Sequence, residues 1–558
     1  MFSRPPVLRR RRALLAASTA ALALALSACG GGTASTAADA GPPQNGGTLK
    51  VAFFPDNAAF ACVDPFQTYW IEHRTVIRNV ADSLTDQDAT NGEIKPWIAQ
   101  SWQVTPDGKQ YTFHLRDGVT FSDGTALDAA AVKANADGWL ATVSQTHGAA
   151  YGSSYILGLS GAEVVDPKTV RFDFATPNSS FLQATSTTNL ALISPSSFAN
   201  SPKDRCLGRY TASGQFTLDN YTPGEGITLS KRPGYAWGSP LSANTGAAHL
   251  DKVEFSYVAE DSVRTGDLVS GAVDIAWPRN PFTVEDRELI ARSDATVQSR
   301  SLPGVSYTFF ANTTAGKPLA DPQVRAALPK ALDLPTYAKT VFGQDYPVVG
   351  GGYDATTPYY LSVADKLKHD PAGAAALLDS AGWTLGPDGY RYKNGAKLTL
   401  TFPLTQFSAG SELVQDQLKH VGIDLKLNTV TTAELPTTLA NGDYDLTQTY
   451  FTRADPGALQ FILDPDLANS KALATNAMTP EVRGQVKALF SHAIQTTDQA
   501  TSKKAYADLQ ALLIDKGVTF PLFERVQYAG VRNDVHGFAF TSESFLKLAD
   551  VWKTPESS

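Results

Sequence analysis

Residues 13 to 29 decide in which compartment this chain folds. An apolar run dominated by Ala and Leu extends from Ala13 to Ala28, and an arginine block, Arg9 to Arg12, stands before it. A basic head, a short apolar middle and small residues at the exit are typical of a secretory signal. The run is shorter than the roughly 20 apolar residues that a membrane-spanning helix needs. Residues 1–28 therefore predict export to the outside of the cytoplasmic membrane.

The exit of this signal also predicts a lipid anchor. Leu26, Ser27 and Ala28 stand directly before Cys29, and small residues before a cysteine look like a lipobox. Cleavage after residue 28 would then leave Cys29 acylated at the cell membrane; the alternative is a plain signal followed by a chance cysteine. Residues 29–46 are rich in Gly, Ala, Ser, Thr and Pro, which is typical of a flexible tether.

The charge of the mature chain excludes some partners. The chain has 558 residues and a net charge of −8; residues 1–28 hold five of its 47 basic residues and no acid, which leaves 42 basic against 55 acidic residues, a net of −13. This balance argues against a nucleic-acid surface and against electrostatic adsorption to an anionic membrane. A body of this length predicts more than one lobe.

Two cysteines remain if Cys29 carries lipid, namely Cys62 and Cys206. Disulfides persist in the compartment to which an exported protein goes. We therefore expect a Cys62–Cys206 disulfide; two buried free thiols are the alternative.

Strand and helix patterns are interspersed along the body, which indicates an α/β fold. Residues 110–116 alternate polar and apolar side chains, as a half-buried strand does. Asp128 suits the N-cap of an Ala-rich helix, and Asp-Pro pairs at 321–322 and 370–371 begin two more. We expect a helix around 76–84, and we expect Pro329 to kink or shorten the helix that follows Asp321.

The order of the motifs resembles the extracellular solute-binding proteins, family 5, of ATP-driven importers for peptides and nickel. The matching segments extend from about Gly47 to Trp552 and include 99–102, 105–108, 111–119, 121–125, 214–216, 270–276, 310–313, 321–328, 381–383, 421–423, 444–445 and 520–522. This resemblance implies a two-lobe fold of the periplasmic-binding-protein type, class II and large, with an extra subdomain in the first lobe. The lobes would close on a solute in the cleft between them.

The same resemblance implies the domain limits. The first lobe with its subdomain would be 47–304, the second lobe 305–527, and residues 528–558 would return to the first lobe. The two crossings between the lobes would act as a hinge.

Ligand-binding residues follow from the resemblance as well. Peptide binders of this family hold the ligand's ammonium with an aspartate in a stretch that 452–461 resembles, which points to Asp455; alternatively, Asp455 only begins a turn before Pro456. Arg453 would face an anionic ligand group or be an ordinary surface charge. Tyr69, Trp70, Tyr450 and Phe451 are expected in the pocket walls, with ordinary core packing as the alternative. The segment 56–74 differs from the usual family pattern.

The sequence has no motif for an enzyme. It contains no Gly-x-Ser-x-Gly elbow, no His-Glu-x-x-His, no phosphate loop and no Rossmann glycine pattern. Its eight His residues include no pair at helical ligand spacing. We therefore expect no catalytic residue, no metal site and no cofactor; an extracellular hydrolase is the remote alternative.

The expected function is that of a lipid-anchored, monomeric receptor outside the cytoplasmic membrane. It would capture an oligopeptide or dipeptide and deliver it to ABC permease subunits with their ATPase. A nickel–chelator complex or another non-peptide solute, such as an opine or a sugar, is the alternative cargo. No nucleic acid is expected as a partner.

Overall fold

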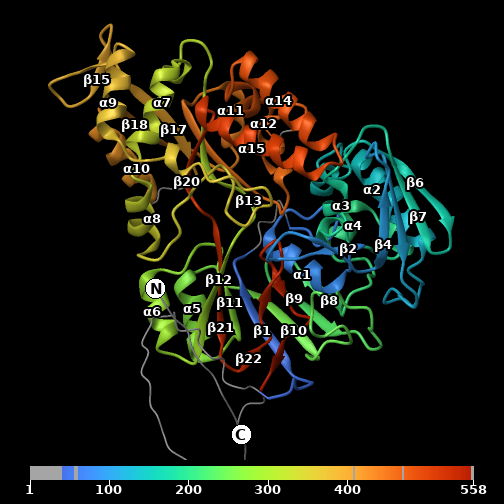
Figure 1. Cartoon of the computed structure of the whole chain (residues 1–558). Helices are drawn as coiled ribbons and strands as arrows, with labels where there is room; N and C mark the ends of the chain where they lie inside the picture. The colour runs from blue at the N-terminus through green and yellow to red at the C-terminus, as the bar shows by residue number, and fades with distance from the viewer. Residues whose placement is uncertain (1–40, 56–60, 406–408, 468–469, 555–558) are drawn as a thin grey trace, which may run out of the picture. The chain divides into compact units, whose positions relative to one another are not determined.

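The computed structural model describes residues 41–55, 61–405, 409–467 and 470–554. The expected signal, Cys29 and most of the tether lie outside these ranges. The described residues from Pro43 onward form one unit, and its arrangement of sheets and helices is drawn in Figure 1.

The first lobe is built on a seven-stranded mixed sheet with the order β12-β21-β11-β1-β10-β9-β8. Its central strand β1 is parallel to both neighbours, β10 and β11, and its Leu49, Val51 and Phe53 are completely buried. The strands are β1 (Thr48–Phe53), β8 (Phe216–Thr222), β9 (Gly226–Lys231), β10 (Lys252–Tyr257), β11 (Ile275–Trp277), β12 (Ala295–Ser301) and β21 (Val526–Arg532). Helices α5 (Asp261–Ser270) and α6 (Val284–Ala291) belong to the same lobe.

A separate four-stranded antiparallel sheet forms the extra subdomain, with the order β4-β5-β7-β6. The strands are β4 (Ala99–Val104), β5 (Gln110–Leu115), β6 (Leu159–Asp166) and β7 (Thr169–Phe174), and helix α2 (Ala129–Gln145) packs on β6 and β7. Residues of β5 alternate between half-buried and buried, as the sequence predicts. The Asp128 carboxylate accepts the Ala131 N–H at 2.9 Å, so the predicted N-cap is confirmed.

The second lobe is built on the antiparallel sheet β19-β13-β20 and the parallel pair β17-β18. These strands are β13 (Gly304–Ala311), β17 (Thr399–Leu404), β18 (Asp424–Thr429), β19 (Leu446–Thr452) and β20 (Thr519–Phe523). The helices are α7 (Pro322–Ala331), α8 (Leu334–Phe342), α9 (Pro371–Ser380), α10 (Ala409–His420), α11 (Leu435–Asn441), α12 (Gln460–Leu463), α13 (Lys471–Asn476), α14 (Pro480–Ile494) and α15 (Gln499–Asp515). Asp321 and Asp370 cap α7 and α9 as expected.

Short elements complete the described chain. The helices are α1 (Ile71–Val80), α3 (Phe181–Ala184) and α4 (Pro202–Cys206), with single 3-10 turns at η1 (Tyr151–Tyr155), η2 (Thr188–Leu190), η3 (Pro195–Ala199), η4 (Pro318–Ala320), η5 (Ala364–Lys366) and η6 (Pro456–Leu459). The strands are β2 (Thr85–Gln87), β3 (Ile94–Pro96), β14 (Thr384–Leu385), β15 (Arg391–Lys393), β16 (Ala396–Lys397), β22 (Val535–His536), β23 (Ala539–Phe540), β24 (Leu546–Lys547) and β25 (Trp552–Lys553).

One local prediction is wrong and another is confirmed. Helix α1 begins at Ile71 and ends at Val80, where Ala81 turns to an extended conformation, so the predicted span 76–84 lies too far along the chain. Pro329 is inside α7, which continues only to Ala331 before Leu332 becomes extended. A proline removes one backbone donor and crowds the preceding turn, and the helix accordingly ends two residues later.

The chain passes twice between the two lobe sheets, and the two passages lie side by side. Strands β12 and β21 pair in the first lobe, while the strands that continue from them, β13 and β20, pair in the second. Between them, the Leu302 N–H donates to the Arg525 carbonyl at 2.9 Å. This paired double crossing is what a hinge between the predicted lobes requires, while the domain limits 304/305 and 527/528 stay a prediction.

No helix among the described residues is long and apolar enough to cross a membrane.

Candidate ligand-binding site

A cavity of about 420 Å³ lies between the two lobes. Its first-lobe lining comes from the loop before α1, from α1 itself, from η1 and from the loop after β11, and its second-lobe lining comes mainly from β13, β19, β20 and the segment around α8. This volume is within the range of small-molecule sites. The cavity is therefore the candidate site for a solute.

Aromatic side chains form most of the walls. The four predicted wall residues, Tyr69, Trp70, Tyr450 and Phe451, all line this cavity. Tyr69 and Tyr450 are 40% and 42% exposed, which excludes simple core packing for these two. The other aromatic residues of the lining are Tyr151, Tyr307, Phe342, Tyr346 and Phe523.

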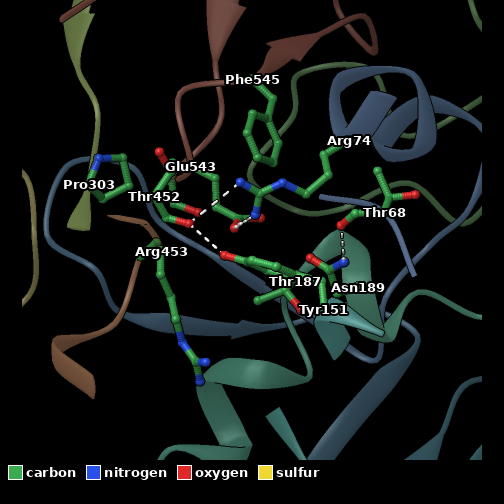
Figure 2. A network of polar contacts seen from close by, with 12 residues as sticks. Thr68, Arg74, Tyr151, Thr187, Asn189, Pro303, Thr452, Arg453, Glu543 and Phe545 are labelled. Carbon is green, nitrogen blue, oxygen red and sulfur yellow. Dashed lines mark hydrogen bonds and ion pairs between the residues drawn. The ribbon is translucent and has the colours of Figure 1, made fainter. Parts of the chain in front are cut away.

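The loop that carries Tyr69 and Trp70 is fixed at several points. Cys62 and Cys206 form a disulfide with their Cα atoms 4.1 Å apart. Next to it, the buried Asp64 carboxylate pairs with Arg205 at 2.6 Å. The Asn189 amide donates to the Pro65 carbonyl at 2.9 Å and to the Thr68 carbonyl at 2.9 Å (Figure 2). These ties place the two aromatic side chains before any ligand arrives.

Figure 2 shows a buried polar network beside the cavity, centred on the Thr452 carbonyl of β19. The Tyr151 hydroxyl donates to this carbonyl at 2.9 Å, and Arg74 Nη2 lies 3.5 Å from it. Arg74 also pairs with Glu543 at 3.2 Å. Burial raises the pKa of Tyr151, so its hydroxyl keeps the proton that it donates at neutral pH. First-lobe side chains thus hold a second-lobe strand.

Three arginines and one glutamate are the charged residues of the cavity lining: Arg74, Arg279, Arg525 and Glu72. Arg525 is at the second crossing and donates to Asp354 at 2.7 Å, to Thr452 Oγ1 at 2.6 Å and to the Pro303 carbonyl at 3.2 Å. Arg279 donates to Glu72 through Nη2 at 2.9 Å. Each of these arginines thus has a carboxylate partner, Arg74 with Glu543, Arg525 with Asp354 and Arg279 with Glu72.

Asp455 and Arg453 lie elsewhere. They form an ion pair with each other and border a small separate cavity of about 60 Å³. The second Asp455 oxygen accepts the Gly457 N–H at 2.6 Å, at the start of η6. Both side chains are at most 2% exposed, so Arg453 is not the surface charge that the sequence left as an alternative. Their binding roles stay a prediction, and the geometry agrees with the turn reading of Asp455.

The sequence did not indicate Arg279 of the cavity lining or Phe54, whose ring centroid lies 4.4 Å from the Arg279 guanidinium carbon, although the sheet order gives a signal for both. Strands β1 and β11 are adjacent and parallel, and Phe54 and Arg279 follow their carboxyl ends. Ligands of open α/β sheets bind outside the carboxyl ends of the strands. Finding these residues requires knowledge of which strands are neighbours, which the chain order alone does not give.

A second cavity, of about 330 Å³, lies beside α1 and is lined by 78–97, 215–242 and 539–549. It contains none of the predicted site residues. Among the described residues, no group of three or more His, Cys, Asp or Glu side chains is placed to hold a metal ion.

Comparison with known proteins supplies the family. Residues 93–470 match the model of the bacterial extracellular solute-binding proteins, family 5, middle region. The chain belongs to this family. The expected resemblance is thereby confirmed, and the protein is a substrate-binding protein of an ABC importer that works outside the cytoplasm.

Individual relatives agree with this assignment. The glutathione-binding protein GsiB of Escherichia coli K12 is 25% identical over 503 residues, which cover 88% of this chain and 92% of that protein. The crystal structure of NikA from Brucella suis in complex with Fe(III)-EDTA matches with a TM-score of 0.78 and 23% identity, over 91% of this chain and 100% of NikA. The oligopeptide-binding protein AppA from Bacillus subtilis, in complex with a nonapeptide, matches with a TM-score of 0.72 and 18% identity, over 92% and 100%. The α/β two-lobe fold expected from the sequence is confirmed by these structures.

Proposed function

We propose that this chain captures a short, anionic, peptide-like solute, of dipeptide or tripeptide size, and delivers it to an ABC permease. The observation that carries the proposal is the cavity of about 420 Å³, whose walls are aromatic and whose lining includes the Arg279 guanidinium. Arginine is suited to carboxylates because its planar donors match two carboxylate oxygens. A cavity near the lower end of the small-molecule range favours a short ligand over a long peptide.

The relative named for glutathione supports this size and charge, since glutathione is a small tripeptide with two carboxylates. In our proposal the receptor is a monomer held at the cell membrane by a lipid on Cys29, and it carries out no chemistry on its cargo. Turnover of a bound peptide by the purified protein would contradict the last point.

A non-peptide carboxylate, such as a metal–chelator complex or an opine, is the second candidate. This candidate is favoured by the contacts of Asp455. Its carboxylate pairs with Arg453 and accepts the Gly457 N–H, so it is not available to bind a ligand ammonium. The structure of NikA from Brucella suis is in complex with Fe(III)-EDTA, which is a metal–chelator complex.

Native mass spectrometry of residues 47–558, purified from cells, tests both candidates. A retained short peptide, or one captured from a mixed pool of dipeptides and tripeptides, supports the proposal. A retained chelate or opine supports the second candidate, a non-peptide carboxylate. Retention and capture of long or cationic peptides alone would contradict both. A ligand at a hundred times its Kd stabilises the protein by about 2.7 kcal/mol, so thermal unfolding checks each hit.

A further inference from the structure

Two of the three cavity arginines, Arg74 and Arg525, use both terminal nitrogens in hydrogen bonds to protein oxygens. All three guanidinium nitrogens of Arg525 donate to protein oxygens: Nε to Asp354, Nη1 to Thr452 Oγ1 and Nη2 to backbone carbonyls. Arg74 directs Nη1 to Glu543 and Nη2 toward the Thr452 carbonyl, and it is 1% exposed. Arg74 joins the two lobes and Arg525 holds the second crossing to the second lobe, and each of their terminal nitrogens already donates to a protein oxygen.

Arg279 differs, because one of its terminal nitrogens donates no hydrogen bond to the described residues. Its Nε and Nη2 donate to the same oxygen, Glu72 Oε1, at 3.2 and 2.9 Å. Its Nη1 has no acceptor within the described part of the chain, and the side chain is 27% exposed. The guanidinium carbon lies 4.1 Å from the Trp70 ring centroid and 4.4 Å from that of Phe54. Such contacts orient an arginine and leave its in-plane donors for hydrogen bonds.

Glu72 has a carboxylate oxygen that accepts no hydrogen bond from the described residues. Oε1 accepts both bonds from Arg279, whereas Oε2 accepts none from the residues that the structure describes. The residue is 5% exposed and lines the cavity. Oε2 is therefore the oxygen of this carboxylate that is open to a donor on the ligand, and hydrogen bonds from charged donors are the strong ones.

We propose that Arg279 and Glu72 together bind an α-amino-carboxylate group of the solute. The ligand carboxylate accepts from Arg279 Nη1, and the ligand ammonium donates to Glu72 Oε2. A neighbouring cation and anion on the protein match a neighbouring anion and cation on the ligand, so no charge is buried without a partner. The proposal rests on the proposed function and narrows it.

This pairing selects a chemical class. A free amino acid and a γ-glutamyl peptide carry the ammonium and a carboxylate on one carbon. An ordinary α-linked dipeptide or tripeptide carries them at opposite ends of the molecule. We therefore expect solutes with a free α-amino-carboxylate end, γ-glutamyl peptides among them, to bind more tightly than α-linked peptides of the same size.

The test measures Kd by calorimetry for two probes, glutathione and its desamino analogue, which lacks only the α-ammonium. Wild-type protein should bind glutathione at least tenfold more tightly, since charge-assisted hydrogen bonds are the strong ones. Glu72→Gln should lose that preference while it keeps its affinity for the desamino analogue. Arg279→Gln should weaken both probes at least tenfold. Arg292→Gln is the matched control, because Arg292 is exposed and its guanidinium pairs with Glu288 of α6, and thermal unfolding of each variant checks the fold.

The zwitterion assignment and the proposed function fail on different results. If the wild type binds glutathione and its desamino analogue equally, or if Glu72→Gln keeps the preference, the zwitterion assignment is wrong and the proposed function stands. The same holds if native mass spectrometry finds a short anionic solute without an α-amino-carboxylate. If the wild type binds no short anionic solute at all, the proposed function fails, and the assignment fails with it.

Discussion

At the scale of single residues, Asp455 shows how a binding motif can be used structurally. Its partner Arg453 is 2% exposed, lies over the Tyr155 ring at 3.8 Å and donates to Ser154 Oγ at 3.0 Å. Removal of one member of a buried ion pair leaves the other charge without compensation, which costs about 3–5 kcal/mol. We expect Asp455→Asn to lower the free energy of unfolding in urea by that order and to leave the affinity for a short anionic solute within about threefold of wild type.

The double variant Arg453→Met/Asp455→Leu is the matched control. It removes both charges at similar volume, which is often neutral for stability, so its unfolding free energy should be closer to wild type than that of Asp455→Asn. A stable Asp455→Asn protein that no longer binds peptide would instead establish the ammonium-binding role predicted from the family motif.

A second residue-scale prediction concerns pH and Asp82. Its carboxylate accepts from the Tyr235 hydroxyl at 3.1 Å and from Trp237 Nε1 at 2.9 Å. Burial raises the pKa of Asp82 to about 6, against the lowering effect of these hydrogen bonds. The folded state therefore binds the proton more tightly than the unfolded state. Stability from this group is fully present below pH 4 and is lost as the pH rises through 6, by roughly 3 kcal/mol in all.

Urea unfolding of wild type and Asp82→Asn at several pH values measures this effect. The variant cannot titrate at this position, so the difference in unfolding free energy should move in its favour between pH 4 and pH 7. Asp117→Asn, at an exposed side chain, should show no such trend. A difference that is constant across this range would mean that the pKa of Asp82 is not raised.

At the scale of elements, α6 of the first lobe reaches α8 of the second. Arg287 donates to the Phe342 carbonyl at 2.8 Å, and Phe342 is the last residue of α8, where a cation is favoured. Arg287 does not line the cavity. If the lobes separate when the solute leaves, this bond breaks, and it therefore favours the ligand-bound form. We expect Arg287→Met to weaken solute affinity roughly two- to tenfold.

Calorimetry with the solute retained in native mass spectrometry measures this change. Arg292→Met, on the same chain segment and with a guanidinium that pairs with Glu288 of α6, should leave the affinity unchanged. Small-angle scattering should show a larger radius of gyration for ligand-free Arg287→Met than for ligand-free wild type. An unchanged affinity in Arg287→Met would show that this contact does not take part in closure.

Elements that depend on local chemistry were predictable, and those that depend on neighbours were not. Residues next to each other in the sequence determine the alternation in β5 and the helix caps at Asp128, Asp321 and Asp370. The four aromatic residues that the resemblance places at the cleft line the cavity, and their role in binding stays a prediction. The partner of Asp455 and the position of Arg279 depend on side-chain packing and strand order, which no local pattern encodes.

At the scale of the whole molecule, the Cys62–Cys206 disulfide joins positions separated by 144 residues. In the chain-entropy model, a crosslink over a loop of this length destabilises the unfolded state by about 5 kcal/mol. We expect the double variant Cys62→Ser/Cys206→Ser to lose up to that amount of unfolding free energy. Wild type with reductant should lose the same amount, and reductant should not change the variant.

The disulfide also bears on binding, because Cys62 begins the segment that carries Tyr69 and Trp70 into the cavity. The Asp64–Arg205 pair and the Asn189 bonds remain when the disulfide is removed, so the segment loses one of several attachments. Solute affinity should therefore fall by less than tenfold while stability falls by several kcal/mol. Two free thiols in the unfolded, unreduced wild-type body would contradict the disulfide. A complete loss of binding in the folded double variant would mean that the disulfide alone positions the aromatic wall.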